Sequence, residues 1–256
     1  MDVVVFTKFV PDPQGTPRLG PEHLLVRGPD GALDPGDEYG LELALQLVEA
    51  EGEAGHVTVV SMGPDEAVTA VQRALAMGAH EGVLISDPAL RGADALGTAR
   101  VLAAAVARRR WDLVIGGVES TDGYTGTVPA TVAELLGASG ISAVRKLERT
   151  TEGIRVERQV EAGYDVLVCA LPAVVTVTAG ANDPRYPSLK GIMQAKQKPL
   201  ERLGLADLGL STEDVAATQV VAAVTDTPAK AGGEVIAAGD DAVARIADLL
   251  AEAKAI

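Results

Sequence analysis

The stretch WDLVIGGVESTDGYTGTVPA, residues 111–130, contains the residue types and spacing best suited to holding a ligand. Its apolar run over 112–115 is typical of a buried parallel strand. The glycines and hydroxyl residues that follow are typical of a β–α loop, and helical spacing resumes at Val128 and continues to Leu136. In an open α/β sheet such a loop lies at the carboxyl end of a strand, where ligands bind. Its amide groups and the helix start suit a phosphate.

The same loop contains two acids, Glu119 and Asp122, and no Lys or Arg. We therefore expect backbone amides and hydroxyl groups, rather than a cation, to hold any phosphate. A solvated connection that binds nothing is the alternative interpretation of an isolated loop of this type.

Groups for catalysis or metal binding are not evident elsewhere in the sequence. The three histidines, His23, His56 and His80, are scattered and lack the spacing of metal ligands. There is no nucleophile elbow, Walker loop, CxxC pair or GxGxxG fingerprint. The single cysteine, Cys169, excludes an internal disulfide. The residues therefore indicate a nucleotide-binding protein without catalytic apparatus.

The composition is that of an acidic chain with an aliphatic core. The 256 residues are 47% hydrophobic but only 3% aromatic, and the formal net charge is −14. This charge disfavours nucleic acid and anionic membranes as partners, because phosphates attract Lys and Arg. No apolar run has the length of a membrane span, and the N-terminus is typical of a strand rather than a signal peptide. We therefore expect a cytoplasmic protein.

The first half of the chain alternates strands with helices, which predicts a doubly wound, mostly parallel α/β sheet. The expected strands cover residues 2–7, 56–61, 82–86 and 112–115, and the expected helices cover 39–51, 65–77, 93–110 and 128–136. Asp37 is the expected N-cap of the first helix. The irregular segment 8–34 is too long for an ordinary connection and is therefore a candidate functional segment.

The pattern changes after Gly140. Strand-like runs over 141–147, 154–160 and 165–170 predict antiparallel hairpins, and the run 173–178 is expected to return to the main sheet. The next segment, NDPRYPSLKGIMQAK, contains two prolines that prevent a helix through its first half. It combines an apolar cluster with nearby lysines, which are Lys190, Lys196 and Lys198.

The last sixty residues are weakly patterned and end in an amphipathic helix expected over 240–255. Such an arm either embraces a partner chain or packs on its own domain, and the sequence favours neither.

These segments resemble the β subunit of electron transfer flavoprotein, in a form similar to the actinobacterial branch. The resemblance covers nearly the whole chain. It rests on the motifs Lys8-x-Val10-Pro11-Asp12, Leu33-Asp34-Pro35, Ala74–Ala79, Gly117–Gly123, Leu171–Val174, Asn182-x-Pro184-Arg185-Tyr186-Pro187-Ser188 and Gly191-Ile192-Met193-x-Ala195-Lys196.

The resemblance implies a Rossmann-like fold of the adenine-nucleotide α-hydrolase type with an antiparallel β extension and a C-terminal arm. Residues 1–195 would form the nucleotide-binding domain, including the extension 141–180 and a recognition loop over 182–196. Residues 196–256 would form an arm whose terminal helix contacts the partner subunit. The implied function is that of a non-enzymatic electron carrier in fatty acid oxidation.

In this family the β subunit forms a heterodimer with an α subunit that carries FAD, and the β subunit itself holds a structural AMP. The pair would accept electrons one at a time from acyl-CoA and related dehydrogenases and pass them to a membrane quinone oxidoreductase. The implied AMP contacts are Phe6, Asp34, Pro35, Gly36, Asp37, Met62, Gly117, Ser120, Thr121, Asp122, Gly123, Thr125, Gly126, Thr127 and Val128. Many relatives have Lys-Gln where this chain has Val118-Glu119.

The resemblance also implies that the segment 182–196 docks dehydrogenases. The implied docking residues are Tyr186, Pro187, Leu189, Ile192 and Met193, with Leu189 as the anchor. Two alternatives stay open. One is a bifurcating relative, whose β subunit holds a second FAD in the AMP site and oxidises NADH. The other is a stand-alone nucleotide-binding α/β protein.

Overall fold

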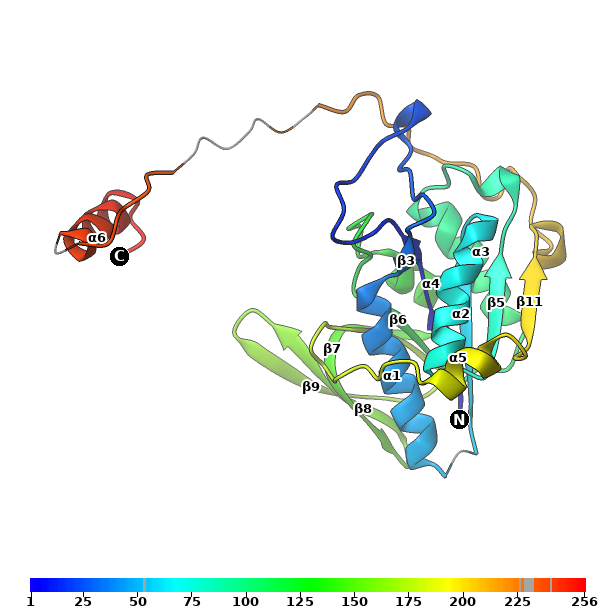
Figure 1. Ribbon diagram of the computed structural model, residues 1–256. Helices are drawn as coiled ribbons and strands as arrows, with labels where there is room; N and C mark the ends of the chain where they lie inside the picture. The colour runs from blue at the N-terminus through cyan, green and yellow to red at the C-terminus, as the bar shows by residue number, and fades with distance from the viewer. Residues whose placement is uncertain (53, 226, 228–232, 240) are drawn as a thin grey trace. The chain divides into compact units, whose positions relative to one another are not determined.

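The computed structural model describes residues 1–52, 54–225, 227, 233–239 and 241–256 (Figure 1). These residues form two compact units, Met1–Val221 and Ala222–Ile256. The expected start of the terminal helix, residue 240, lies outside the described residues. Within the described parts of the chain, no helix is both long and apolar enough to cross a bilayer.

The first unit is built on a nine-stranded sheet with the order β11-β5-β4-β1-β6-β10-β7-β8-β9. Every pair from β11 to β7 is parallel, and β7-β8-β9 is antiparallel. The strands are β1 (Asp2–Phe6), β4 (His56–Met62), β5 (Glu81–Ile85), β6 (Leu113–Gly117), β7 (Ser139–Thr150), β8 (Gly153–Val160), β9 (Gly163–Cys169), β10 (Ala173–Val177) and β11 (Leu200–Leu203). The predicted fold is confirmed, including the hairpin extension and the return of residues 173–177 to the main sheet.

Helices cover both faces of the sheet. The helices are α1 (Pro35–Ala50), α2 (Val68–Met77), α3 (Ala95–Ala107), α4 (Val128–Leu136), α5 (Leu189–Ala195) and, in the second unit, α6 (Ala242–Glu252). Short 3₁₀ turns occupy Pro21–His23, Asp65–Ala67, Pro88–Leu90 and Ala206–Leu208, and a small antiparallel sheet pairs β2 (Phe9–Val10) with β3 (Ala32–Leu33).

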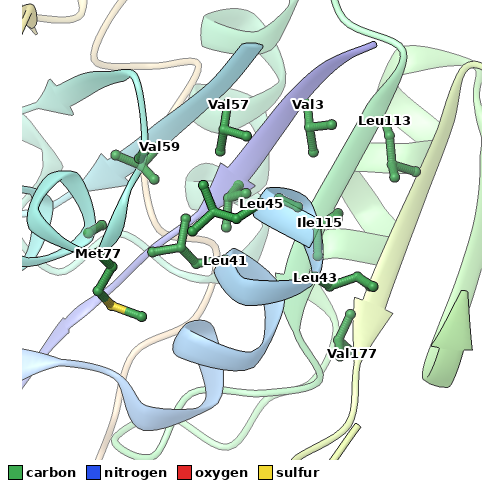
Figure 2. Close-up of a cluster of buried hydrophobic side chains, with 14 of the residues drawn as sticks. Val3, Leu41, Leu43, Leu45, Val57, Val59, Met77, Leu113, Ile115 and Val177 are labelled. Atoms are coloured by element: carbon green, nitrogen blue, oxygen red, sulfur yellow. The ribbon is translucent and has the colours of Figure 1, made fainter. Parts of the chain in front are cut away.

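Side-chain alternation along β1 produces two cores. Val3 and Val5 pack with α1 and α2, whereas Val4 and Phe6 pack with α3 and α4. Figure 2 shows Leu41 and Leu45 of α1 pointing toward the sheet residues of the first core. Successive strand residues face opposite sides, so a strand covered on both faces must be apolar throughout, as DVVVF nearly is.

The first helix begins two residues before the predicted cap. Asp34 is its N-cap and accepts a 2.8 Å hydrogen bond from the Gly36 amide, with Pro35 in the first turn. Asp37 is therefore inside the helix, and its assignment as the cap is wrong. Proline is well suited to the first turn because its missing N–H would have no intrahelical partner there.

The segment after residue 195 differs from the predicted arm. β11 pairs in parallel with β5, and Leu205 and Val215 are buried in the core beneath α3. The sheet thus extends past the predicted boundary at 195/196, and the chain divides only after Val221. In the second unit, α6 has no buried residue. Short strands with mixed polarity, such as LERL, carry too little periodicity to be recognised before their partner strand is known.

Candidate nucleotide site and docking segment

Asp34 joins the start of α1 to the loop that follows β6. Its side chain is fully buried. One carboxylate oxygen accepts the Gly36 amide, and the other accepts both the amide and the hydroxyl of Thr121, at 2.7 and 2.9 Å. Both donors of Thr121 are therefore used inside the protein. Asp34 and Thr121 shape the loop and leave other groups to meet a ligand.

Asp37 forms a second tie between α1 and the strand ends. Its carboxylate accepts a hydrogen bond from the Lys8 amide at 2.7 Å. Burial raises the pKa of Asp37 well above its ordinary value, and the neighbouring Asp34 carboxylate raises it further. A Cβ atom at Gly117 would lie 3.1 Å from the Asp37 oxygen, so the glycine permits this close approach.

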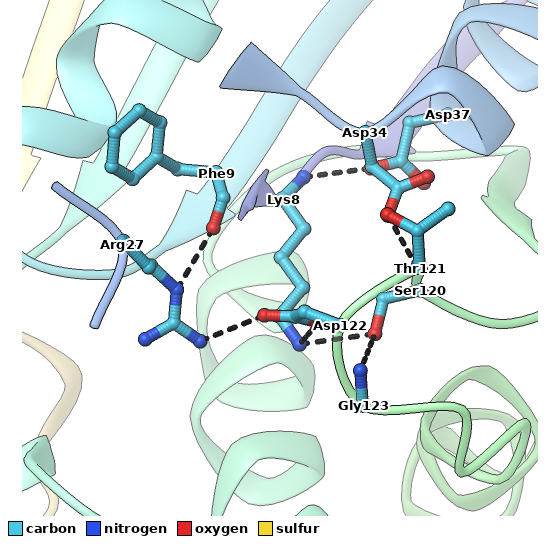
Figure 3. A network of polar contacts seen from close by, with 9 residues as sticks. All are labelled: Lys8, Phe9, Arg27, Asp34, Asp37, Ser120, Thr121, Asp122 and Gly123. Atoms are coloured by element: carbon cyan, nitrogen blue, oxygen red, sulfur yellow. Dashed lines mark hydrogen bonds and ion pairs between the residues drawn. The ribbon is translucent and has the colours of Figure 1, made fainter. Parts of the chain in front are cut away.

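Asp122 is held between two cations, as Figure 3 shows. Lys8 Nζ donates to it at 2.5 Å and to Ser120 Oγ at 3.0 Å, while Arg27 Nη2 donates to its other oxygen at 2.9 Å. The Asp122 side chain is only 3% exposed. Burial alone would raise its pKa, but the hydrogen bonds and charge of Lys8, aided by Arg27, outweigh burial and hold the pKa below its ordinary value.

That backbone amides and hydroxyls, rather than a cation, would hold a phosphate stays a prediction, but two cations do lie beside the loop. The loop itself has none, but the fold brings Lys8 from the end of β1 and Arg27 from the irregular segment 8–34. Arg27 also donates to the Phe9 carbonyl oxygen, which fixes its guanidinium. Sequence reasoning missed both residues. A signal existed for Lys8, because it directly follows β1 and therefore lies at the carboxyl edge of the sheet.

The start of α4 completes the candidate nucleotide site. Tyr124 and Gly126 have φ values of +49° and +63°, and Thr127 makes no side-chain cap on the helix. Among the described residues, the hydroxyls of Thr125 and Thr127 have no hydrogen-bond partner. Gly123 also belongs to this loop, and its amide donates to Ser120 Oγ at 3.3 Å. The loop thus presents exposed hydroxyls and a helix start.

Phe6 and Met62 end the neighbouring strands β1 and β4, and both pack on the side of the sheet that α3 and α4 cover. The structure therefore brings the predicted AMP residues to one edge of the sheet in two groups: Phe6 and Met62 at two strand ends, and the others around α1 and the 117–128 loop. Thr7 and Ser61 have buried hydroxyls without a partner among the described residues. By strand alternation, these two side chains lie on the opposite side of the sheet from Phe6 and Met62.

The predicted docking residues lie together on and before α5. Tyr186, Leu189 and Met193 are 88%, 82% and 68% exposed, and Ile192 is 49% exposed, whereas Pro187 is half-buried. Ser188 caps α5 by accepting the Gly191 amide at 3.0 Å. Large apolar side chains gathered at this exposure typically mark a binding surface.

The inner side of this segment is fixed to α2. A Cβ atom at Gly191 would collide with the Ala76 carbonyl oxygen, so α5 lies directly on the end of α2. Lys198 Nζ donates to the carbonyl oxygens of Leu75 and Ala79, at 2.8 and 2.6 Å, and burial lowers the pKa of this lysine. Lys198 therefore satisfies the C-terminus of α2, unlike Lys190 and Lys196 of the same lysine group, which are exposed.

Among the described residues, no group of three or more His, Cys, Asp or Glu side chains could hold a metal ion.

Known proteins resemble this chain over most of its length. A family model described as electron transfer flavoprotein domain matches residues 23–208. The electron transfer flavoprotein subunit beta of Mycobacterium tuberculosis strain H37Rv is 40% identical over 242 residues, covering 91% of each chain. That of Mycobacterium leprae is 38% identical over 264 aligned residues, covering 100% of this chain and 99% of the relative. The caffeyl-CoA reductase-Etf complex subunit CarD of Acetobacterium woodii is 36% identical over 244 residues, covering 92% of each. The chain therefore belongs to the electron transfer flavoprotein family, in the group of its β subunits.

Proposed function

We propose that this chain is the non-enzymatic β subunit of a cytoplasmic, heterodimeric electron transfer flavoprotein. It binds a structural AMP and supports an α subunit that carries FAD. The heterodimer accepts electrons one at a time from acyl-CoA and related dehydrogenases and passes them to a membrane quinone oxidoreductase. Membership of the family supports the electron-transfer role, and the geometry of the two surface segments supports the finer assignments.

The observation that carries the nucleotide site is the uncapped start of α4. Thr127 makes no side-chain bond to the first turn of α4. α2 and α6 also begin without such a bond, so the position of α4 after the β6 loop distinguishes it. The first-turn amides of a helix have no intrahelical acceptor and carry a partial positive charge, so an anion is a suitable partner for them. α4 follows a loop at the carboxyl end of β6, which is the usual ligand position in this sheet type.

The residues present fit AMP. We assign Phe6 and Met62 to the base, and the hydroxyls of Ser120, Thr125 and Thr127 with the amides of residues 126–128 to the phosphate. The remaining predicted residues form the wall of the site behind these groups. They are Asp34, Pro35, Gly36, Asp37, Gly117, Thr121, Asp122 and Gly123. AMP supplies no redox chemistry, so its role here is to complete the fold around the loop.

We assign dehydrogenase docking to the segment 182–196. Leu189 is the anchor because it is 82% exposed and stands among other exposed apolar side chains. Burying one leucine stabilises a complex by roughly 1.5–3 kcal/mol, which suits a contact that must form and break with each electron. The exposed Lys190 and Lys196 favour acidic partner surfaces.

We assign the C-terminal part of the chain to contact with the α subunit. In the second unit, α6 exposes Val243, Ile246 and Leu250 along one face. A helix with an apolar face and no buried residue in its own unit needs another surface to cover that face. Within the predicted arm 196–256, we assign this role to the second unit, Ala222–Ile256.

A second candidate is the bifurcating function, in which the β subunit holds FAD in place of AMP and oxidises NADH. The similarity to a relative named as part of a caffeyl-CoA reductase-Etf complex favours testing it. Counting flavins in the heterodimer, purified after co-expression with the α subunit, decides between the two. One flavin per heterodimer supports the carrier, and two support bifurcation. A stable, nucleotide-loaded monomer that never binds an α subunit would overturn both.

A further inference from the structure

We propose that Arg185 is a positioning residue for dehydrogenase docking: it clamps the docking segment 182–196 to α1 through Glu42 and Glu49 and so presents the apolar docking residues ready-made. This inference rests on the proposed docking function of that segment. Arg185 itself does not belong to the exposed apolar cluster, so its effect on docking is exerted through the position of its neighbours.

The clamp uses the whole guanidinium. Nε donates to Glu42 at 2.7 Å, and Nη2 donates to the other Glu42 oxygen at 3.0 Å. Nη1 and Nη2 donate to the two oxygens of Glu49, at 2.5 and 3.0 Å. The backbone amide of Arg185 also donates to Glu42, at 3.1 Å. Two carboxylates, seven residues and so about two helical turns apart on α1, thus hold one side chain in a single orientation.

The burial of Glu42 makes this contact more than a surface ion pair. Its side chain is 5% exposed, whereas that of Glu49 is 47% exposed. Burial alone would raise the pKa of Glu42, but hydrogen bonds from Arg185 and Gln46 outweigh burial and hold the pKa below its ordinary value. Removing the guanidinium would leave a buried carboxylate without its charged partner, which is strongly unfavourable. A lysine has one donor centre and cannot reproduce the fork.

The segment depends on this clamp because its own backbone provides little support. Residues 182–188 form no helix or strand, and Pro184 and Pro187 have no amide to donate. Asn182 Nδ2 donates to the Tyr39 carbonyl oxygen of α1 at 3.0 Å, which fixes the start of the segment. Between that point and the cap of α5 at Ser188, Arg185 is the side chain that ties the segment to α1.

The clamp therefore lowers the cost of docking. A flexible segment loses conformational entropy when a partner binds it, whereas a segment that is already ordered does not. Loosening it should weaken the encounter with the dehydrogenase and leave the electron-transfer step of the bound pair unchanged. In steady-state terms the KM for the heterodimer as electron acceptor should rise while kcat stays the same.

The test uses the heterodimer with Arg185→Lys, Arg185→Gln and, as a matched control, Arg202→Gln. Arg202 forms one 3.5 Å pair with the exposed Asp65 and lies outside the segment. We expect both Arg185 variants to raise KM for an acyl-CoA dehydrogenase by about tenfold, with kcat and flavin content matching the control. Hydrogen exchange of amides in 183–195 should accelerate in the variants and not in the control.

Three results would overturn the proposal. Arg185→Lys could match the control in KM and exchange, the KM could stay constant while kcat falls, or flavin could be lost in proportion to activity. A Leu189→Ala heterodimer measured in parallel separates the positioning role of Arg185 from the docking function of the segment. If Leu189→Ala raises KM and Arg185→Lys does not, the positioning role fails alone. If Leu189→Ala has no effect, the docking function itself fails.

Discussion

The nucleotide loop and the docking segment are held by similar clamps with reversed charges. In the loop, the acid Asp122 lies between Lys8 and Arg27. In the docking segment, the cation Arg185 lies between Glu42 and Glu49. Both clamps bury one carboxylate almost completely and leave the cations about one-third exposed. The same chemistry therefore fixes two surface stretches without helix or strand, residues 118–127 and 182–188.

What each clamp presents is different. The loop presents hydroxyl groups and a helix start, which suit an anion, whereas the docking segment presents Leu189 and Met193, which suit an apolar pocket. α1 serves both regions, because Asp34 and Asp37 lie at its start and Glu42 and Glu49 lie along its length. In each segment, the charged residues that fix the chain are therefore different from the exposed residues that the segment presents.

Removing the charge of Asp122 should have the largest effect on the loop clamp. Asp122→Asn removes the charge that accepts hydrogen bonds from Lys8 and Arg27, and we expect it to lower the free energy of unfolding by about 2–3 kcal/mol. Because the pKa of Asp122 is lowered in the folded protein, its contribution is fully present above about pH 4 and is lost as the pH falls through the folded-state pKa. Denaturant midpoints at neutral and acidic pH measure both effects.

Asp65→Asn is the matched control for this loss, because Asp65 is exposed and makes one long ion pair. The account of the loop clamp fails if both variants shift the midpoint equally at neutral pH.

Leu189→Ala tests what the docking segment presents to a partner. It removes the exposed anchor without touching the clamp, so we expect a KM for dehydrogenases that is roughly ten- to a hundredfold higher, from a loss of about 1.5–3 kcal/mol. Flavin and nucleotide content should be unchanged. Val220→Ala, which truncates a side chain 90% exposed elsewhere in the first unit, should leave KM unaltered. Equal dehydrogenase-linked rates for the wild type and Leu189→Ala would contradict the docking assignment.

Gly126→Arg tests the presented side of the loop. Gly126 has a φ of +63°, which an L side chain adopts at a cost, and a Cβ atom there would lie 3.7 Å from the Val118 carbonyl oxygen. We expect AMP affinity to fall about tenfold, equivalent to ~1.4 kcal/mol, and assembly with the α subunit to slow. Titration of AMP into nucleotide-depleted heterodimer measures the first effect, and full AMP occupancy at wild-type affinity would contradict the site.

Lysines near the docking segment provide the smallest contrast. Lys198 is committed to carbonyl oxygens of α2, whereas Lys190 is exposed. Lys190→Gln should reduce the salt dependence of docking, and Lys198→Gln should instead lower the free energy of unfolding by about 1 kcal/mol. Dehydrogenase rates across a salt series, with denaturant curves beside them, distinguish the two. The opposite pattern would mean that Lys198 takes part in steering.

The sequence pattern was sufficient for the fold because β1, β4, β5 and β6 are short apolar runs alternating with amphipathic helices. The pattern was insufficient where contacts between residues distant in sequence determine the local structure. Asp37 has the residue type of a cap, but Asp34 is the cap because Pro35 begins the helix. Likewise, LERL becomes a strand only beside β5, so β11 was not predicted.

The candidate site shows the same limit. The position of the 117–128 loop follows from local pattern, whereas the Asp122 clamp joins residues 8, 27 and 122 and is determined by tertiary contacts. Lys198 shows the opposite case, a charged residue that sequence alone groups with a possible ligand-binding surface. In the sequence it lies near other lysines, but in the fold its ammonium group donates to carbonyl oxygens at the end of α2. Charged side chains that satisfy helix ends or buried acids are thus difficult to separate from ligand-binding ones by sequence alone.

Mass analysis of the small molecules released from the purified heterodimer tests the central claim most directly. The account predicts one AMP and one FAD per heterodimer, with the AMP diminished in Gly126→Arg and the FAD retained. Two FAD and no AMP would show that a dinucleotide occupies the loop, and release of FAD alone in single stoichiometry would show that the loop binds no nucleotide.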